Sequence, residues 1–316
     1  MNRRLSSHPA GHVTRPSTQT TGETRLSAQG HHAGGRPLSP AYFGALAVMV
    51  VAATVYGLVV EDAYRLVSVM TKETWRAQDA VSLTLVPVVL WSSRRARAGL
   101  LSAHLLTTGI ALWWAYCYAH LSIGAPLNPL FLVYLAILLL AGFAALDGLL
   151  RLDVQALEPA FTRAPLRAAT WFLALGGIGI GALWLSEIIA AWPEGLPPNI
   201  HLSELPNPTW VLDLAWIIPM CIAAAVLMRR QHPAGPALAA VMLLALLILS
   251  VSMLLVTPFA VAAGLHTDPE IRTQIVVFTG VFTALGAVEL WLLVRGRRRL
   301  GRVTSAWLRE GWWPHG

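Results

Sequence analysis

Six polar side chains that can bind a cation or carry a proton lie in or at the ends of long apolar stretches of the sequence. They are Asp79, Tyr116, Tyr118, His120, Glu187 and Asp213. An ionisable side chain inside a membrane-spanning helix is costly, so it usually faces protein or water rather than lipid. With both chain termini in the cytoplasm, as argued below, these residues fall in the outer third of the bilayer. Together they predict an outer polar pocket.

Each of these residues, taken singly, also has a structural interpretation. Asp79 and Asp213 stand near predicted helix N-termini, where a carboxylate accepts hydrogen bonds from free backbone N–H groups and meets a favourable dipole. Glu187 can extend its carboxylate to the membrane surface, and His120 can cap the stretch that it ends. For each residue alone, the structural interpretation is favoured. That all of them are predicted to lie at the same depth in the membrane favours a shared pocket.

A second polar site is expected on the inner side, at Glu289. This residue lies more than one turn inside the last apolar stretch, with no basic residue three or four positions away. Two interpretations are open: Glu289 pairs with Arg94, Arg95 or Arg229 of another stretch, or it serves a proton or ion path.

The sequence contains no motif for metal, haem or hydrolase chemistry. Metal-ligand pairs such as His-x-x-x-His are absent, and neither His104 nor His120 has a partner histidine at matching depth. Cys117 and Cys221 form no Cys-x-x-Cys motif and are expected to be buried apolar residues. We therefore expect no metal and no cofactor, and an activity other than catalysis is favoured.

The composition indicates a membrane protein. Of the 316 residues, 56% are hydrophobic and 12% are charged, whereas soluble domains carry roughly 25% charged residues. The mean hydropathy is +0.59. Eight apolar stretches are each near the length that crosses a ~30 Å hydrocarbon layer: 41–60, 78–93, 99–120, 129–149, 169–191, 209–228, 236–263 and 274–294. Because lipid cannot satisfy open backbone groups, we expect an all-α bundle of these eight helices.

The basic residues predict the orientation of the chain. The net charge is +7, and all but four of the 23 Lys and Arg residues fall in the two tails or in alternate loops. The four exceptions are Arg65, Lys72, Arg76 and Arg272. This asymmetry places both termini in the cytoplasm, and it excludes nucleic acid as the reason for the positive charge. The ratio of 22 Arg to 1 Lys is compatible with a bacterial source, so we expect a bacterial inner membrane.

Three parts of the chain are distinguished by composition. Residues 1–39 are rich in Ser, Thr, Gly, His and Pro and are expected to form a disordered cytoplasmic tail. Residues 40–296 hold the eight predicted helices. Residues 297–316 interleave arginines with tryptophans, a pattern that favours contact with anionic lipid headgroups over binding to nucleic acid.

One short pattern occurs twice. His120-Leu-Ser is followed by Asn128-Pro129, and His201-Leu-Ser is followed by Asn207-Pro208. Asn suits the position that caps a helix and Pro suits the first helical turn, so two helices can begin alike without duplication. A parallel internal repeat remains an alternative.

Four runs of sequence resemble a family of uncharacterised bacterial polytopic membrane proteins. The runs are "QDAVSLTLVPVVL" from Gln78, "SSRRARAGLL" from Ser92, "YCYAHLSIGAPLNPLFLVYLA" from Tyr116 and "PTWVLDLAWIIP" from Pro208. The resemblance covers roughly residues 40–295. It implies a multi-pass topology, and since the family has no established activity, it implies no substrate, cofactor or site residue.

Three kinds of function are compatible with these observations. The first is binding or transport of a small solute, cationic or proton-coupled, through the outer pocket. The second is a membrane-embedded enzyme acting on a lipid or lipid-linked substrate near Glu61 and Asp62, for which the short outer loops leave little room. The third is a sensor or assembly partner without catalysis that acts through its tails.

Overall fold

The structure is a computed structural model that describes residues 37–152, 165–192 and 207–309, with side chains described as far as Arg295. Most of the predicted N-terminal tail, the side chains of the C-terminal tail and His201 lie outside the described residues. Within them every element is helical, which confirms the predicted all-α class. The elements are α1 (Pro40–Val59), α2 (Val69–Arg97), α3 (Leu101–Gly124), α4 (Phe131–Leu150), α6 (Pro165–Ala191), α7 (Pro208–Leu212), the π-helical turn η3 (Asp213–Ile217), α8 (Ile218–Arg229), α9 (Ala234–Ala262), the 3₁₀ turn η4 (Leu265–Thr267) and α10 (Pro269–Arg309).

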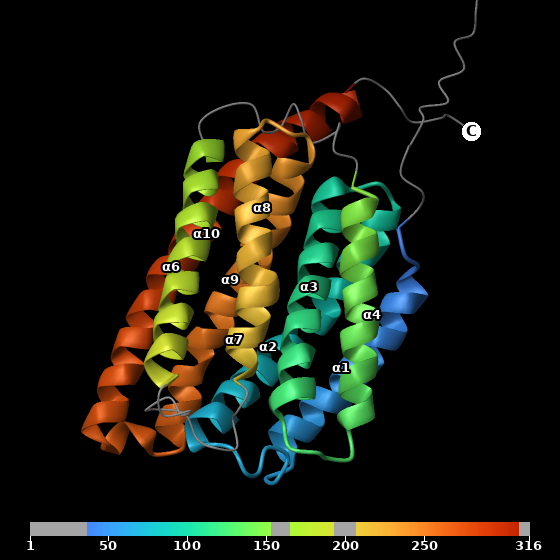
Figure 1. The fold of residues 1–316 in the computed structure, drawn as a ribbon. Coiled ribbons are helices and arrows are strands. Elements are labelled where there is room, and N and C mark those ends of the chain that lie inside the picture. Colours follow the sequence, from blue (N-terminus) through green and yellow to red (C-terminus); the bar gives the residue numbers. More distant parts are fainter. Residues whose placement is uncertain (1–36, 153–164, 193–206, 310–316) are drawn as a thin grey trace, which may run out of the picture. The chain divides into compact units, whose positions relative to one another are not determined.

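The long helices run side by side in two groups (Figure 1). Helices α1 to α4 pack against one another, and α6, α8, α9 and α10 form the second group. The groups meet where α9 contacts α2 and α3, and where α7 contacts α3. Helices α7 and α8 form one rod through η3, so α3, α9 and this rod lie at the junction of the two groups.

Six helices in the described part of the chain are long and apolar enough to cross a membrane. They are Pro40–Val59, Phe131–Leu150, Arg167–Ala191, Pro208–Arg229, Ala234–Ala262 and Pro269–Arg295. This confirms the helical, multi-pass membrane character of the protein. Helices α2 and α3 are long but less apolar. In α3 the unbroken run from Thr107 to Leu121 is buried, so its polar groups face protein.

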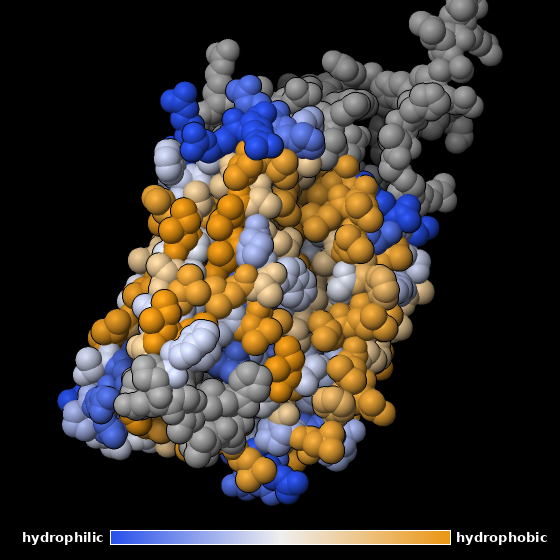
Figure 2. Space-filling view, viewed as in Figure 1, coloured by the Kyte–Doolittle hydropathy of each residue, from blue (hydrophilic) through white to orange (hydrophobic). Residues whose placement is uncertain are grey.

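The two faces of α4 show how such a bundle is adapted to lipid. Large side chains such as Leu132, Leu139 and Leu150 are 75%, 58% and 76% exposed, whereas the small Ala141 and Gly148 face the other helices. In a soluble protein the exposed face of a helix would be polar. Small residues at helix contacts let membrane helices approach closely. On the side of the molecule drawn in Figure 2, hydrophobic residues cover the middle and hydrophilic residues lie at both ends.

The doubled Asn-Pro pattern begins two helices, as expected. Asn207 is the N-cap of α7 and its Oδ1 accepts the backbone N–H of Thr209 at 2.9 Å, with Pro208 in the first turn. Asn128 Oδ1 accepts the N–H of Leu130 at 2.9 Å, but α4 begins only at Phe131. The capping interpretation is therefore confirmed for the second copy, and the first copy uses the same hydrogen bond in a turn before its helix.

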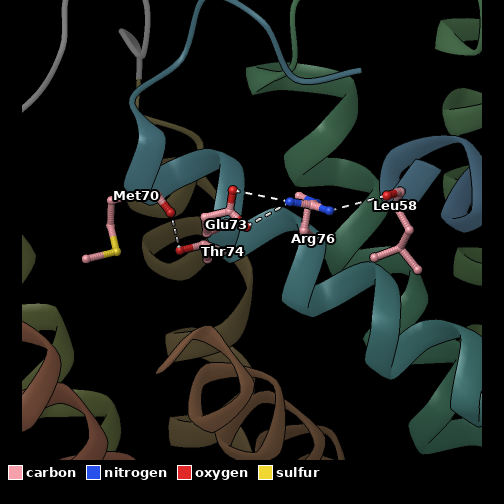
Figure 3. Close-up of polar contacts among 5 residues, drawn as sticks. All are labelled: Leu58, Met70, Glu73, Thr74 and Arg76. Atoms are coloured by element: carbon pink, nitrogen blue, oxygen red, sulfur yellow. Dashed lines mark hydrogen bonds and ion pairs between the residues drawn. The ribbon is translucent and has the colours of Figure 1, made fainter. Parts of the chain in front are cut away.

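Helix α2 begins at Val69, well before the predicted start at residue 78. Its first turns carry Glu73 and Arg76, which hydropathy assigns to a loop. In the structure Arg76 Nη1 lies 3.2 Å from Glu73 Oε2, and Arg76 Nη2 donates to the Leu58 carbonyl oxygen at 3.3 Å (Figure 3). Leu58 lies in the last turn of α1, so Arg76 satisfies a free carbonyl there and ties the two helices together.

The earlier start of α2 changes the interpretation of Asp79. Because the helix begins at Val69, Asp79 stands in its third turn rather than near its N-terminus. It cannot cap the helix, so the capping interpretation of Asp79 is wrong. Its carboxylate is buried, with 3% of the residue exposed, and needs partners from other elements.

Candidate binding cavity

A cavity of about 860 Å³ lies among α2, α3, α6, the α7–η3–α8 rod, α9 and α10. Its wall is mostly apolar, with aromatic side chains such as Phe172, Phe278 and Phe282. Polar side chains stand among the apolar ones on α2, α3, α7, η3, α9 and α10. Concave sites of roughly 300–1,000 Å³ with apolar walls and a few polar groups are typical of small-molecule binding.

Asp213 contributes a carboxylate to the cavity and is held by two neutral donors. Tyr116 Oη of α3 donates to Asp213 Oδ1 at 2.7 Å, and Trp184 Nε1 of α6 donates to Asp213 Oδ2 at 2.9 Å. All three residues line the cavity, and Asp213 is 8% exposed. The hydrogen bonds orient the carboxylate but bring no positive charge to it.

The position of Asp213 depends on the π-helical turn that it begins. Pro219 has no N–H group, and its ring crowds the carbonyl of Ala215 four residues earlier, so a regular α-helix would lose a hydrogen bond and be strained at this point. The N–H of Ile218 instead bonds to the carbonyl oxygen of Asp213, five residues back. Such π-helical turns are rare and frequently lie at functional sites. This π-helical turn ends two residues before Pro219.

His120 supports the same wall of the cavity. Its Nε2 lies 3.2 Å from Thr209 Oγ1 of α7, and its Nδ1 lies 3.2 Å from the carbonyl oxygen of Tyr116. The His120 ring packs edge-on against the Tyr116 ring at 4.5 Å between centroids. Both ring nitrogens therefore face oxygens of the protein, and His120 positions Tyr116 and the beginning of α7.

Glu289 of α10 lines the same cavity, although the sequence assigns it to a separate inner site. Its Oε2 accepts a hydrogen bond from Ser250 Oγ of α9 at 2.8 Å, and the residue is 2% exposed. The arginines that could pair with it are engaged elsewhere. Arg94 donates to its own helix, and Arg95 and Arg229 lie over the rings of Trp91 and Trp171.

Neither cavity carboxylate has a basic partner in the part of the structure described here. The ion pairs found there are Arg76–Glu73 and Arg151–Asp147. Of the two interpretations of Glu289, the arginine pair is therefore not formed among the described side chains. Asp213 and Glu289 line one cavity, although the sequence assigns them to separate outer and inner sites.

Gln78 is a cavity residue that sequence reasoning missed. It lines the cavity from α2, is 6% exposed, and its Oε1 has no hydrogen-bond partner among the described residues. Consecutive residues on a helix point in different directions, so Gln78 and Asp79 face different neighbours. An uncharged side chain in an apolar stretch does not stand out as a candidate site residue. The sequence therefore predicted that Asp79, rather than Gln78, contributes to the pocket.

Asp79 and Tyr118 lie in a second polar cluster and do not line the cavity. Tyr64 Oη, from the connection between α1 and α2, donates to Asp79 Oδ2 at 2.6 Å. Burial, and after it the nearby carboxylate, raises the pKa of the Tyr64 phenol well above its ordinary value, so this phenol keeps its proton. Tyr118 packs against Tyr134 at 5.9 Å between ring centroids.

Glu187 is half-buried on α6 and also lies outside the cavity lining. Its Oε2 accepts the indole N–H of Trp210 at 3.2 Å. The six residues of the predicted outer pocket therefore separate in space. Tyr116, His120 and Asp213 meet at the cavity, whereas Asp79, Tyr118 and Glu187 lie elsewhere.

The described side chains include no group of three or more His, Cys, Asp or Glu residues placed to hold a metal ion. Cys117 and Cys221 are buried and unpaired. The polar chemistry described for the cavity is thus that of carboxylates, hydroxyls, amides, an imidazole and indoles.

Comparison with known proteins gives no match at the level of families, of curated proteins or of solved structures. The resemblance to bacterial polytopic membrane proteins therefore stays a prediction.

Proposed function

We propose that the protein binds a small amphipathic cation in the cavity and carries it across the membrane. The observation that supports this is that Asp213 and Glu289 line one apolar cavity and neither has a basic partner among the described residues. Ionisable groups inside membrane helices are rarely kept without a functional reason. A positively charged ligand would supply the missing counter-charge.

The length of the cavity supports passage as well as binding. Its lining on α10 extends from Thr273 to Glu289, which is about 24 Å at a rise of 1.5 Å per residue. This is most of the ~30 Å thickness of a hydrocarbon core. In this proposal, Asp213 and Glu289 each provide a binding site for the cation. Glu289 accepts one hydrogen bond, from Ser250, and can take up a proton when the cation leaves.

The proposal includes a topology of eight crossings in a bacterial inner membrane, with both termini in the cytoplasm. Helices α2 and α3 are then crossings as well, and polar side chains of the two helices can pair with each other inside the bundle, as Thr107 does with Ser92. The positive-inside rule supports this orientation. In it, Asp213 lies toward the outer surface and Glu289 toward the inner surface.

A membrane-embedded enzyme acting on a lipid is less well supported. His120 lies beside Tyr116 and Asp213, as a catalytic base would, but both of its ring nitrogens already face oxygens of the protein. A general base needs a nitrogen within reach of the substrate proton.

Binding can be tested with dansylcadaverine, a fluorescent primary ammonium on an aliphatic chain, and the purified protein in detergent. The wild-type protein is expected to give a saturable rise in dansyl fluorescence. Asp213→Asn and Glu289→Gln should each weaken binding by roughly tenfold or more, because each removes a buried counter-charge. Glu187→Gln is the matched control, since this carboxylate lies outside the cavity.

Transport is then measured in proteoliposomes, as uptake of the same probe driven by a proton gradient. Asp213→Asn and Glu289→Gln should abolish uptake, whereas Glu187→Gln should retain it. The proposal fails if the wild-type protein gives no saturable binding, or if both cavity variants bind and transport the probe as well as wild type does.

A further inference from the structure

We infer that the cavity opens sideways to the hydrocarbon layer between α6 and α10, and that its ligand is a single-chain cationic amphiphile that enters from the bilayer. This inference rests on the proposed function and adds the substrate class and its route. It is carried by Leu183 of α6 and by Val277 and Val281 of α10. These three residues line the cavity and are nevertheless 51%, 59% and 49% exposed.

The packing of the two helices explains this exposure. Helix α6 packs mainly against α8 and α10 mainly against α9, and both lie at the edge of the second helix group (Figure 1). Gly176 of α6 also lines the cavity, and nothing lies within 4 Å of a Cβ atom added there. The described part of the chain therefore leaves the cavity open between α6 and α10.

The residues that border the opening indicate that it faces lipid. Ile178 and Leu185 of α6 and Val276 and Val288 of α10 do not line the cavity, and all four are exposed. Large apolar side chains exposed on both sides of an opening are typical of contact with hydrocarbon, whereas polar groups would border an aqueous entrance. The opening is thus continuous with the lipid-facing surface of the two helices.

The opening lies at a depth that a membrane covers. Leu183 stands eight residues before the end of α6 at Ala191, and Val277 stands eight residues after the beginning of α10 at Pro269. At a rise of 1.5 Å per residue, each is about 12 Å from its helix end. In the proposed orientation these ends point to the outer surface, so the opening falls within a ~30 Å hydrocarbon core, on its outer side.

The opening lies close to a carboxylate that the proposed function assigns to cation binding. Trp184 follows Leu183 on α6 and donates its indole N–H to Asp213 Oδ2 at 2.9 Å. A ligand whose ammonium group is bound at Asp213 can therefore extend its hydrocarbon chain between α6 and α10 into the outer leaflet. Such a chain stays in apolar surroundings along its whole length. A hydrated inorganic ion, by contrast, would have to cross lipid to reach this opening.

The first test places a bimane label at the opening, in Val281→Cys protein reconstituted in lipid nanodiscs. Lipids with a doxyl group on the acyl chain should quench this label as strongly as a label in Leu139→Cys, on the exposed face of α4. Aqueous iodide should quench neither label. Quenching of Val281→Cys by iodide alone would mean that water fills the opening. Protection from both quenchers would mean that protein covers it, and a disulfide between two Val281→Cys chains would identify a second copy. Each of these results overturns the inference.

The second test obstructs the opening. Val281→Trp should slow both the association and the dissociation of dansylcadaverine by roughly tenfold and leave Kd within about twofold, because the entrance narrows while the carboxylates stay in place. Val276→Trp is the matched control, since this residue is exposed on α10 but does not line the cavity. Leu183→Trp obstructs the opposite edge and is used if Val281→Trp does not fold. Equal association rates in the obstructed protein and the control would overturn entry from the bilayer.

The third test concerns the substrate class. At equal mole fraction in the lipid, dodecylammonium and octadecylammonium should displace dansylcadaverine equally well, because the part of the longer chain beyond the cavity stays in lipid. A closed cavity would instead reject the longer chain by roughly tenfold or more, since its wall would be overpacked, and this result overturns the inference. If wild type gives no saturable binding, the proposed function fails, and the doxyl lipids still decide whether the cavity opens to lipid.

Discussion

The Asp79 carboxylate is enclosed by residues that leave no space around it. Gly57 of α1 lies directly against Asp79 Oδ2 and Tyr64 Oη, so a Cβ atom at this position would collide with both. The hydrogen bond between Tyr64 and Asp79 therefore depends on the absence of a side chain on the facing helix. Gly57 permits close approach of α1 and α2.

Gly57→Ala is expected to destabilise the protein by about 1–3 kcal/mol, because the added methyl group overpacks a buried polar contact. Gly44→Ala, on the same helix, is the matched control, since nothing lies within 4 Å of a Cβ atom there. The control should be neutral or slightly stabilising, as alanine favours a helix over glycine. Thermal unfolding in detergent, followed by circular dichroism, measures both, and equal unfolding temperatures would rule out the tight contact at Gly57.

At the level of residues, the sequence indicated which polar side chains are enclosed by other helices but not the direction in which they point. Charge and apolar length indicate which residues lie inside the bundle, and Asp213, Tyr116 and His120 were found in this way. The adjacent residues Gln78 and Asp79 show the limit. Both lie at one depth, but only contacts between helices decide which of them faces the cavity, and the hydropathy of one segment carries no such information.

Helix α8 and the turn before it show how a single proline positions a functional group. Pro219 prevents regular α-helical bonding to Ala215, and the chain responds with the π-helical turn Asp213–Ile217. In a regular helix each residue advances by about 100°. The extra residue in the π turn therefore alters the direction in which Asp213 points relative to the rest of α8.

Pro219→Ala is expected to restore regular α-helical bonding and to turn Asp213 away from Tyr116 and Trp184. Affinity for dansylcadaverine should fall by roughly tenfold, since the carboxylate leaves its place on the cavity wall. Total helix content, measured by circular dichroism, should not decrease. Pro87→Ala in α2 is the control, because Pro87 is also inside a helix but adjoins no π-helical turn and no residue that lines the cavity. Unchanged affinity in Pro219→Ala would show that the π turn does not position Asp213.

Helix boundaries were predictable where a capping residue stands directly before an apolar stretch. Asn207 with Pro208 marks the beginning of α7 as expected. The beginning of α2 was missed, because Lys72, Glu73 and Arg76 are charged and hydropathy assigns charged residues to loops. The ion pair of Arg76 with Glu73, and its bond to the α1 carbonyl, compensate for these charges within the structure. The Glu73–Arg76 pair is a spacing of three within α2, but the bond to the Leu58 carbonyl involves another helix and has no signature in the α2 sequence.

For the whole molecule, the apolar helices and their class followed from the sequence, but the cavity did not. In a soluble protein a polar and an apolar face reveal which side of a helix is buried. Here α4 exposes Leu139 and buries Ala141, and both are apolar. Because lipid and protein interior attract the same residues, the grouping of α1–α4 and α6–α10 is determined by side-chain size and shape instead.

The crossing of the membrane by α2 and α3 can be tested from the turn that joins them. Gly99 takes the left-handed conformation with φ +88°, and Leu100 N–H bonds to the Arg95 carbonyl oxygen at 3.1 Å, so α2 reverses directly into α3. If both helices cross, this turn lies on the opposite side of the membrane from the α1–α2 and α3–α4 connections.

Single cysteines at Asp62, Ala98 and Leu127 report on these three positions, all of which are exposed. In spheroplasts, a membrane-impermeant maleimide should label Asp62→Cys and Leu127→Cys, and should label Ala98→Cys only after detergent is added. The wild-type chain is the control, because its Cys117 and Cys221 are buried and should stay unlabelled. Equal labelling of all three variants in intact spheroplasts would mean that the α2–α3 hairpin does not cross.

The cavity would then not run between the two surfaces, because α2 and α3 form part of its wall. The proposed transport would be excluded even if the cation binds.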